Sequence, residues 1–199
     1  MSGTTTTSYG LALAPGGLFL AQELANTGLP LAREPDPLQD LEAAGAWLQG
    51  AFTEWSHRTG QPAPDASLTA RDVPKLRVLR VLVREWLTTG EPASPSTSTL
   101  HVSLGPGRGV SYGPTSSGVA ALLSLIAVEA LLARRSQTLE RLKVCANRGC
   151  GAVFYDESRN ASRRWHDVKV CGNAVNLRAS RARRAAQAST GEHTVPGDR

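Results

Sequence analysis

Four side chains near the C-terminal end constrain this chain more than any other feature. Cys145 and Cys150 are separated by four residues, fifteen residues follow, and His166 and Cys171 are again separated by four. Two ligand pairs of equal spacing, joined by a loop, allow the second pair to fold back onto the first around one tetrahedral ion. The spacing therefore predicts one structural Zn2+ held by these four residues.

A zinc ion would also explain how so short a segment folds. A unit of about 40 residues buries too little surface to be stable alone, whereas zinc binding supplies folding free energy directly. Four protein ligands leave no open coordination position, so a hydrolytic zinc is not expected. The alternative for His166 is an ordinary surface histidine, which would leave three cysteines and a water; the repeated spacing favours His166 as a ligand.

The aromatic residues between the ligands have two interpretations. Phe154, Tyr155 and Trp165 either stack on nucleic acid bases or form the small core beneath the metal. The core interpretation is favoured, because so small a unit has almost nothing else apolar to pack.

Positive charge is concentrated in the same part of the chain. Residues 141–199 carry 12 Lys or Arg against 5 Asp or Glu, whereas residues 1–140 carry 10 against 12. A basic unit beside a near-neutral body indicates a polyanionic partner for that unit. The alternative is a basic tail that only improves solubility.

A basic helix is predicted from about Cys171 to about Ala188. At 3.6 residues per turn, a row of arginines lies on one face and a row of small residues lies on another. The small face is expected to pack on the zinc unit, and the arginines are expected to face duplex phosphates or guanine edges. The alternative is a solvated helix face. The arginines are Arg178, Arg181 and Arg184, and the small residues are Val175, Ala179, Ala182 and Ala186.

The N-terminal region is predicted to be a mainly α-helical domain that contains a small β-hairpin. Its apolar periodicity predicts helices over about 37–57, from residue 69 or 72 to 87, and from residue 116 or 117 to about 135, and alternation predicts a hairpin of 100–104 with 109–112. Asp36 is the predicted cap of the first helix. The fold class expected for the whole chain is mainly α with a small β-hairpin, followed by a small zinc-stabilised ββα-like finger.

Three further expectations concern the packing of this domain. The helix over 117–135 is apolar nearly all round, so it is expected at the centre of the bundle and is expected to continue, after a break near Ser136, towards Leu142. The arginines of the preceding helix are expected to face solvent. Residues 1–9 and 189–199 are expected to be disordered. The arginines concerned are Arg77, Arg80 and Arg84.

Asn26 and Thr27 are candidate ligand-binding residues of the N-terminal domain. They either hydrogen-bond a small-molecule effector or close a turn after the first apolar segment. The turn is favoured, because Asn and Thr are common turn and cap residues.

Cysteine usage and hydropathy indicate the cellular compartment. All three cysteines belong to the proposed metal site, so a disulfide framework is not expected. The protein is expected in the reducing environment of the cytoplasm. No signal peptide is apparent, and the longest apolar stretch, residues 118–133, is too short to span a bilayer. No arrangement combines a nucleophile or open metal with a base, so an enzyme is not expected. The oligomeric state is left open.

The finger region resembles the CGNR-type zinc finger, named for a Cys-Gly-Asn-Arg tetrapeptide at its last ligand. The residues that carry the resemblance are Cys145 to Cys150, Phe154-Tyr155-Asp156, Ser158-Arg159-Asn160, Ser162-Arg163-Arg164-Trp165 and Cys171-Gly172-Asn173. The N-terminal part looks like the mostly helical ABATE domain that usually precedes this finger, through Leu24-Ala25-Asn26-Thr27, the helix order and the hairpin. The resemblance implies an ABATE-like domain over 10–139 and a finger with a basic helix over 140–188.

Two positions depart from the family pattern. The third ligand is normally cysteine and is His166 here, which zinc accepts but which makes the site more sensitive to acid. Ala174 replaces the arginine that gives the family its name. If that arginine contacts phosphate in relatives, this chain has lost one contact.

The resemblance implies a bacterial, cytoplasmic transcription regulator that binds DNA through its finger. The expected DNA contacts are Arg163, Arg164, Arg178, Arg181 and Arg184, and an effector or protein partner is expected to act on the N-terminal domain. Two alternatives stay open. One is that the finger is a docking module for an acidic protein, and the other is that it is a thiol and zinc stress sensor that loses its metal when its cysteines are oxidised.

Overall fold

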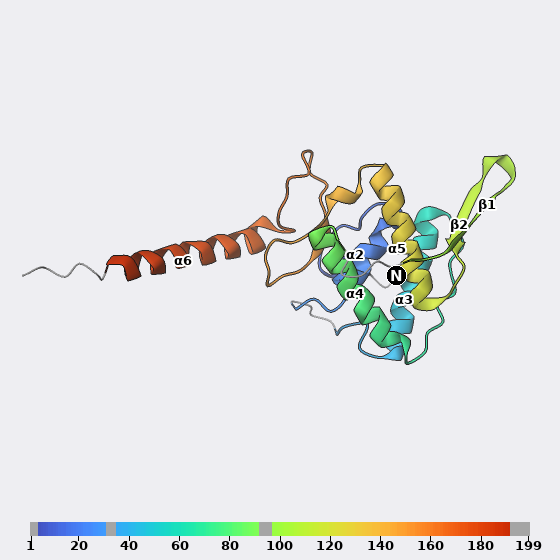
Figure 1. The fold of residues 1–199 in the computed structure, drawn as a ribbon, viewed down its shortest axis with the longest axis horizontal. Helices are drawn as coiled ribbons and strands as arrows, with labels where there is room; N and C mark the ends of the chain where they lie inside the picture. The colour runs from blue at the N-terminus through green and yellow to red at the C-terminus, as the bar shows by residue number, and fades with distance from the viewer. Residues whose placement is uncertain (1–3, 31–34, 92–96, 192–199) are drawn as a thin grey trace, which may run out of the picture.

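The computed structural model describes residues 4–30, 35–91 and 97–191 (Figure 1). It is mainly α-helical with two small antiparallel hairpins, which confirms the predicted fold class. In chain order the helices and strands are α1 (Thr5–Ser8), α2 (Phe19–Asn26), α3 (Leu41–Thr59), α4 (Asp72–Thr89), β1 (Leu100–Leu104), β2 (Val110–Pro114), α5 (Gly118–Arg135), β3 (Leu142–Val144), β4 (Val153–Tyr155) and α6 (Asn173–Gly191). Short 3-10 turns cover Gly16–Leu18, Pro106–Arg108 and Leu139–Arg141, and a π-helical turn covers Val168–Gly172.

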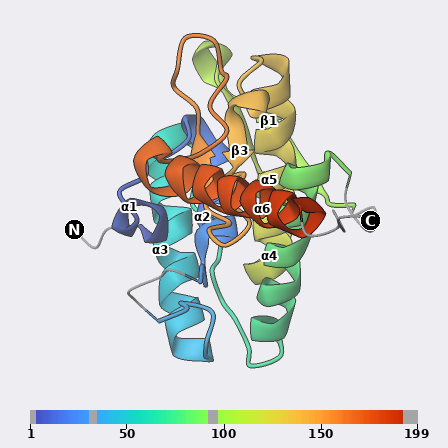
Figure 2. The same cartoon turned by 90° about the vertical axis from the view of Figure 1, so that its left-hand side faces the viewer.

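Helix α2 is the centre of the molecule. Every residue of this helix is buried, and it contacts α1, α3, α4, α5 and β4. Figure 2 shows α2 between α3 and α4. The prediction that residues 117–135 form the central helix is wrong, because α5 leaves Leu131 and Leu132 59% and 45% exposed. The polar residues of α2 concealed its burial in the sequence, since each finds a protein partner.

The N-terminal residues are more ordered than predicted. The carboxylate of Glu23 accepts hydrogen bonds from the Thr5 N–H at 2.6 Å and the Thr6 N–H at 2.9 Å, so it satisfies free donors at the start of α1. Thr6 is fully buried. The prediction of disorder over residues 1–9 is therefore wrong for residues 4–9, while residues 1–3 lie outside the described part.

Helix α3 begins later than predicted. The Asp40 carboxylate accepts from the Ala43 N–H at 2.8 Å and caps the helix, which ends at the left-handed Gly60. Asp36, the predicted cap, instead accepts from the Leu38 N–H at 3.0 Å and closes a turn before the helix. Local propensity allowed either aspartate, and the burial of Leu38 in the core selected the turn.

The prediction that the arginines of α4 face solvent holds for the exposed Arg77 and is wrong for the half-buried Arg80 and Arg84; all three are hydrogen-bonded within the protein. Arg77 donates to the carbonyls of Leu38 and Gln39, and Arg84 donates to the Ala25 carbonyl at 2.6 Å and the Thr27 carbonyl at 2.8 Å. Arg80 forms an ion pair with Asp36 at 2.7 Å. These guanidinium groups satisfy carbonyls at the end of α2 and in the turn before α3.

The hairpin of β1 and β2 projects from the bundle (Figure 1) and confirms the predicted strands. The hairpin is fixed to the bundle by Tyr112, in the middle of β2, whose hydroxyl donates to the Glu129 carboxylate at 2.7 Å. The Trp55 indole N–H donates to the same oxygen at 2.8 Å. The pKa of Tyr112 is raised, mainly because the hydroxyl is buried and to a lesser extent because of its hydrogen bond to Glu129. Glu129 is buried on the apolar helix α5 because these two donors satisfy it.

The finger shares the core of the N-terminal domain. Leu142 of β3 and Val153 of β4 belong to the same buried cluster as Leu24, Phe52 and Leu122. The expected helical continuation towards Leu142 is wrong: α5 ends at Arg135, and the chain passes through a 3-10 turn into β3. Strands β3 and β4 pair antiparallel and carry the chain into the metal-binding residues.

Candidate metal centre

The structure brings the four predicted ligands together. One donor atom from each of Cys145, Cys150, His166 and Cys171 lies within 4.8 Å of the other three. The His166 Nδ1 atom lies 3.4 Å from the Cys150 Sγ and 3.8 Å from the Cys171 Sγ. Tetrahedral zinc, with bonds of about 2.0–2.3 Å, places its ligand atoms about 3.5–3.8 Å apart. The donor set and these two distances therefore fit one structural Zn2+.

A tight turn presents the first two cysteines. The Cys145 N–H donates to the Ala152 carbonyl at 2.8 Å, which extends the β3–β4 pairing to the ligand itself. The Cys150 N–H donates to the Asn147 carbonyl at 2.8 Å, so the chain reverses between the two cysteines. Gly151 follows with a φ of +68°, a left-handed conformation that returns the chain to β4.

A loop and a π-helical turn present the second pair. The Ala146 N–H donates to the Arg164 carbonyl at 2.9 Å, which joins the loop before His166 to the first turn. The Arg163 guanidinium donates to the His166 carbonyl. The Cys171 N–H donates to the Asp167 carbonyl at 2.9 Å, and the Asp167 carboxylate accepts from the Val170 N–H at 2.9 Å. The turn over Val168–Gly172 thus fixes Cys171 at the base of α6.

Asn147 does not bind the metal itself but supports the metal ligand Cys171, and its role was not predicted from the sequence. Its Nδ2 atom donates to the Cys171 Sγ at 3.3 Å, and its Oδ1 atom accepts from the Gly149 N–H at 3.3 Å and from Arg178 at 3.1 Å. Hydrogen bonds of this kind orient metal ligands and tune their basicity. In the sequence, an asparagine between two cysteines indicates only a turn. Its role could not be predicted because its partners, Cys171 and Arg178, lie 24 and 31 residues away.

Burial sets the protonation of the ligands. The three cysteines are almost fully buried, and burial raises the pKa of the Cys150 thiol to about 12. Burial also lowers the pKa of His166, so the imidazole is neutral and able to bind metal near pH 7. Zinc binding must release the thiol protons, and the affinity for zinc therefore falls as the pH falls.

Asp156 organises the long loop between the ligand pairs, and it too was missed. This fully buried carboxylate accepts from Lys143 at 2.8 Å, from the Arg163 N–H at 2.8 Å and from the Ser158 N–H at 3.0 Å. Burial alone would raise the pKa of Asp156, but hydrogen bonds from Lys143, Ser158 and Arg163 outweigh it and hold the pKa below its usual value.

The aromatic residues of the finger form its core, as expected. Phe154 is buried in one cluster with the three cysteines, and Trp165 packs against that cluster. Tyr155 packs against the larger core of the N-terminal domain. The Arg163 guanidinium lies 5.6 Å from the centre of the Phe154 ring, and the Arg164 guanidinium lies 5.5 Å from that of Trp165.

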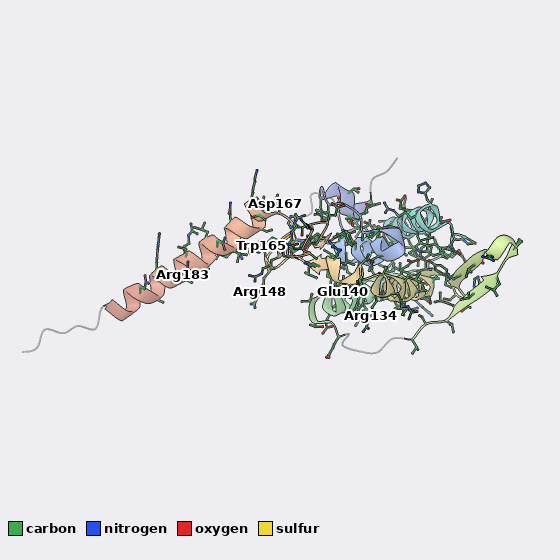
Figure 3. The ribbon with its side chains drawn as sticks, turned by 90° about the horizontal axis from the view of Figure 1, so that it is seen from above. Arg134, Glu140, Arg148, Trp165, Asp167 and Arg183 are labelled. Atoms are coloured by element: carbon green, nitrogen blue, oxygen red, sulfur yellow. The ribbon has the colours of Figure 1, made fainter. Side chains whose placement is uncertain are left out.

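Helix α6 extends from the zinc unit away from the rest of the molecule (Figure 1, Figure 3). Arg178, Arg181 and Arg184 are exposed. Figure 3 shows Arg183 on α6, farther from the N-terminal domain than Arg148 and Trp165 of the finger. The predicted inner face is wrong, because Ala179 and Ala182 are exposed as well. The π-helical turn directs the helix axis outward, so the described residues place no element against these alanines. The helix also continues to Gly191, past its predicted end. Residues 192–199 of the expected disordered tail lie outside the described part.

Asn26 and Thr27, the candidate ligand-binding residues, are fully buried. Asn26 hydrogen-bonds both backbone groups of Val153, and the Thr27 hydroxyl donates to the Leu24 carbonyl at 2.7 Å. These contacts favour a structural role for both side chains. Asn26 does more than close a turn, because it connects α2 to the finger.

Comparison with known proteins gives one assignment. Residues 141–184 match the model of the CGNR zinc finger family. A comparison with curated proteins finds no match. Among the described residues, no helix is both long and apolar enough to cross a membrane. The similarity of residues 10–139 to an ABATE domain stays a prediction. Sequence pattern, ligand geometry and family model agree that residues 141–184 form a zinc-binding module of the CGNR zinc finger type.

Proposed function

We propose that the protein is a zinc-dependent DNA-binding transcription regulator, and that α6 is its principal DNA-contacting element. The observation that carries this proposal is the exposed, outward-directed basic helix at the zinc centre. Residues 173–191 contain four arginines and no aspartate or glutamate. Among the described residues, no carboxylate forms an ion pair with these arginines, and duplex phosphates are a complementary partner for their charge.

The arrangement of the arginines suits a helix in a major groove. Arg178 and Arg184 are about 9 Å apart along the axis at 1.5 Å per residue. Arg183 lies about 160° around the helix from Arg181, so the helix presents cations to both phosphate walls of a groove that is wide enough to admit it.

The proposed role of zinc is to set the direction of this helix. Cys171 binds the metal from within the π-helical turn, and α6 begins two residues later. Asn147 connects the same cysteine to Arg178 of α6. Loss of the ion would free the base of the helix, and the arginines would then no longer be held in a fixed position.

Arg163 and Arg164 remain secondary candidates for DNA contact. The Arg163 side chain is engaged by the His166 carbonyl and the Phe154 ring, and Arg164 stacks on Trp165. Ala174, in the first turn of α6, supplies no charge where the family pattern has arginine. The helix arginines must therefore provide most of the contacts.

The test is the salt dependence of duplex binding, measured by fluorescence anisotropy with the zinc-loaded chain. If about four arginines meet phosphates, log affinity should fall with log salt at a slope of about −3 to −4. Arg181→Ala and Arg184→Ala should each reduce the slope by about 0.9. Arg71→Ala, an exposed arginine outside the finger, is the matched control. Binding that does not depend on salt would contradict the proposal.

One observation favours a docking module as a second candidate. Val168, Val170 and Leu177 are more than half exposed at the base of α6, where a protein partner could cover them. Pull-down with and without nuclease separates the two roles, since only DNA-mediated capture is lost on nuclease treatment. The third candidate, a thiol sensor, has less support, because the cysteine sulfurs are buried from oxidants.

A further inference from the structure

A cleft of about 700 Å³ lies where the N-terminal helices meet the finger. Its walls come from the end of α4, the end of α5, strand β3 and the finger loop around Ser162. Small-molecule sites have volumes of about 300–1,000 Å³ and are commonly found between structural units. The size and position of this cleft are therefore those of a ligand site.

Two cations in the cleft lack an acidic partner. The guanidinium of Arg134, at the end of α5, forms no hydrogen bond or ion pair with the described residues, and the guanidinium of Arg164 contacts only the Trp165 ring among them. Lys143 and Arg163 also line the cleft, but they are held by Asp156 and the His166 carbonyl. Glu140 is the acidic residue of the wall. Arg134 and Arg164, one from each structural unit, are thus available to a ligand.

Apolar side chains also line the cleft. Trp86, Leu87 and Leu139 line the cleft beside the cations. An inorganic anion would leave this apolar surface in water, and an uncharged ring would leave both guanidinium groups without a partner. We infer that the cleft binds a small organic acid in which a carboxylate, held by Arg134 and Arg164, is joined to an apolar ring that packs on Trp86.

Such a ligand would act on the metal centre. The Arg164 carbonyl accepts from the Ala146 N–H beside Cys145, and Arg163 donates to the carbonyl of His166. A carboxylate that joins Arg164 to Arg134 fixes this loop against α5. The cleft is therefore the place where a bound acid connects the N-terminal domain to the loop that carries a zinc ligand.

The test is isothermal titration calorimetry of the full-length zinc-loaded chain with three probes. Naphthalene-2-carboxylate should bind saturably at one site. Naphthalene-2-carboxamide, which has the ring without the charge, and inorganic phosphate, which has the charge without the ring, should each bind at least about 10-fold more weakly. No saturable heat with the carboxylate, or equal binding of the carboxamide, would overturn the inference.

Matched variants locate the binding. Arg134→Ala and Arg164→Ala should each weaken naphthalene-2-carboxylate about 10-fold, because each removes a charge-assisted hydrogen bond. Arg135→Ala is the control, since Arg135 is exposed on the next position of α5 and does not line the cleft. Circular dichroism and zinc content verify folding. Equal effects of Arg134→Ala and Arg135→Ala would sink the assignment. No DNA is present, so the result is independent of the proposed DNA binding.

Discussion

The side chain of Asn26 hydrogen-bonds both backbone groups of Val153, which lies 127 residues later in the chain. The Val153 N–H donates to Oδ1 at 2.8 Å, and Nδ2 donates to the Val153 carbonyl at 2.9 Å. Gln22, one turn earlier on α2, adds a contact of 3.3 Å to the same carbonyl. Strand β4 is thus held by β3 on one edge and by side chains of α2 on the other, so the finger and the N-terminal domain depend on each other.

Asn26→Ala should destabilise the zinc-loaded protein by about 2–5 kcal/mol, because it leaves the buried Val153 N–H without its partner and the Val153 carbonyl with only the longer contact to Gln22. Urea denaturation followed by circular dichroism measures this change. Asn176→Ala, the same substitution at an exposed position of α6, should have little effect. Equal stability of the Asn26→Ala variant and the wild type would show that the pairing contributes nothing.

Removal of zinc should loosen α2 as well as the finger. Without the ion, Cys145 and Cys150 no longer hold the turn that leads into β4, and the partners of Gln22 and Asn26 are released. Hydrogen–deuterium exchange with and without a strong chelator should show faster exchange in residues 19–26 and 142–155. Faster exchange confined to the finger would contradict the coupling.

His166→Ala should lower zinc affinity by more than about 100-fold. Loss of a group that only hydrogen-bonds a ligand costs about 10- to 100-fold, and loss of a ligand should cost more. His166→Cys should retain one zinc per chain, because a thiolate can occupy the same tetrahedral position. Metal content after dialysis against a chelator measures both variants. His57→Ala, an exposed histidine of α3, is the control. Full zinc retention by His166→Ala would remove this residue from the site.

Asn147→Ala should reduce zinc affinity about 10- to 100-fold while leaving all four ligands in place. The hydrogen bond to Cys171 is lost, and the contact that joins the first turn to Arg178 is lost with it. Competition with a chromophoric chelator gives the affinity. Asn160→Ala, an exposed asparagine of the same finger, should bind zinc as tightly as the wild type.

Asp156→Asn should be less stable than the wild type at pH 7, and this difference should shrink on acidification. The folded protein holds the pKa of Asp156 below its unfolded value, so the stabilisation is present above about pH 4 and is lost as the pH falls towards the folded-state pKa. Urea midpoints of both proteins between pH 7 and about 2 test this. Glu157→Gln, at the neighbouring exposed carboxylate, should show no such trend.

Local patterns in the sequence were sufficient for the metal ligands and for most of the helices and strands. The spacing of Cys145, Cys150, His166 and Cys171 depends only on how far a turn and a loop reach, so the ligand set could be read directly. Apolar periodicity located α4, α5 and the β1–β2 hairpin for the same reason.

The tertiary structure decided what depends on partners distant in sequence. The burial of α2 could not be predicted, because Gln22, Glu23 and Asn26 look solvent-exposed until β4 and the N-terminal residues satisfy them. Arg77 and Arg84 of α4 likewise donate to distant carbonyls, one in the turn before α3 and one in α2. The direction of α6 depends on one π-helical turn at Cys171. Spacing fixes which residues can share an ion, whereas only long-range hydrogen bonding and packing fix where a helix lies.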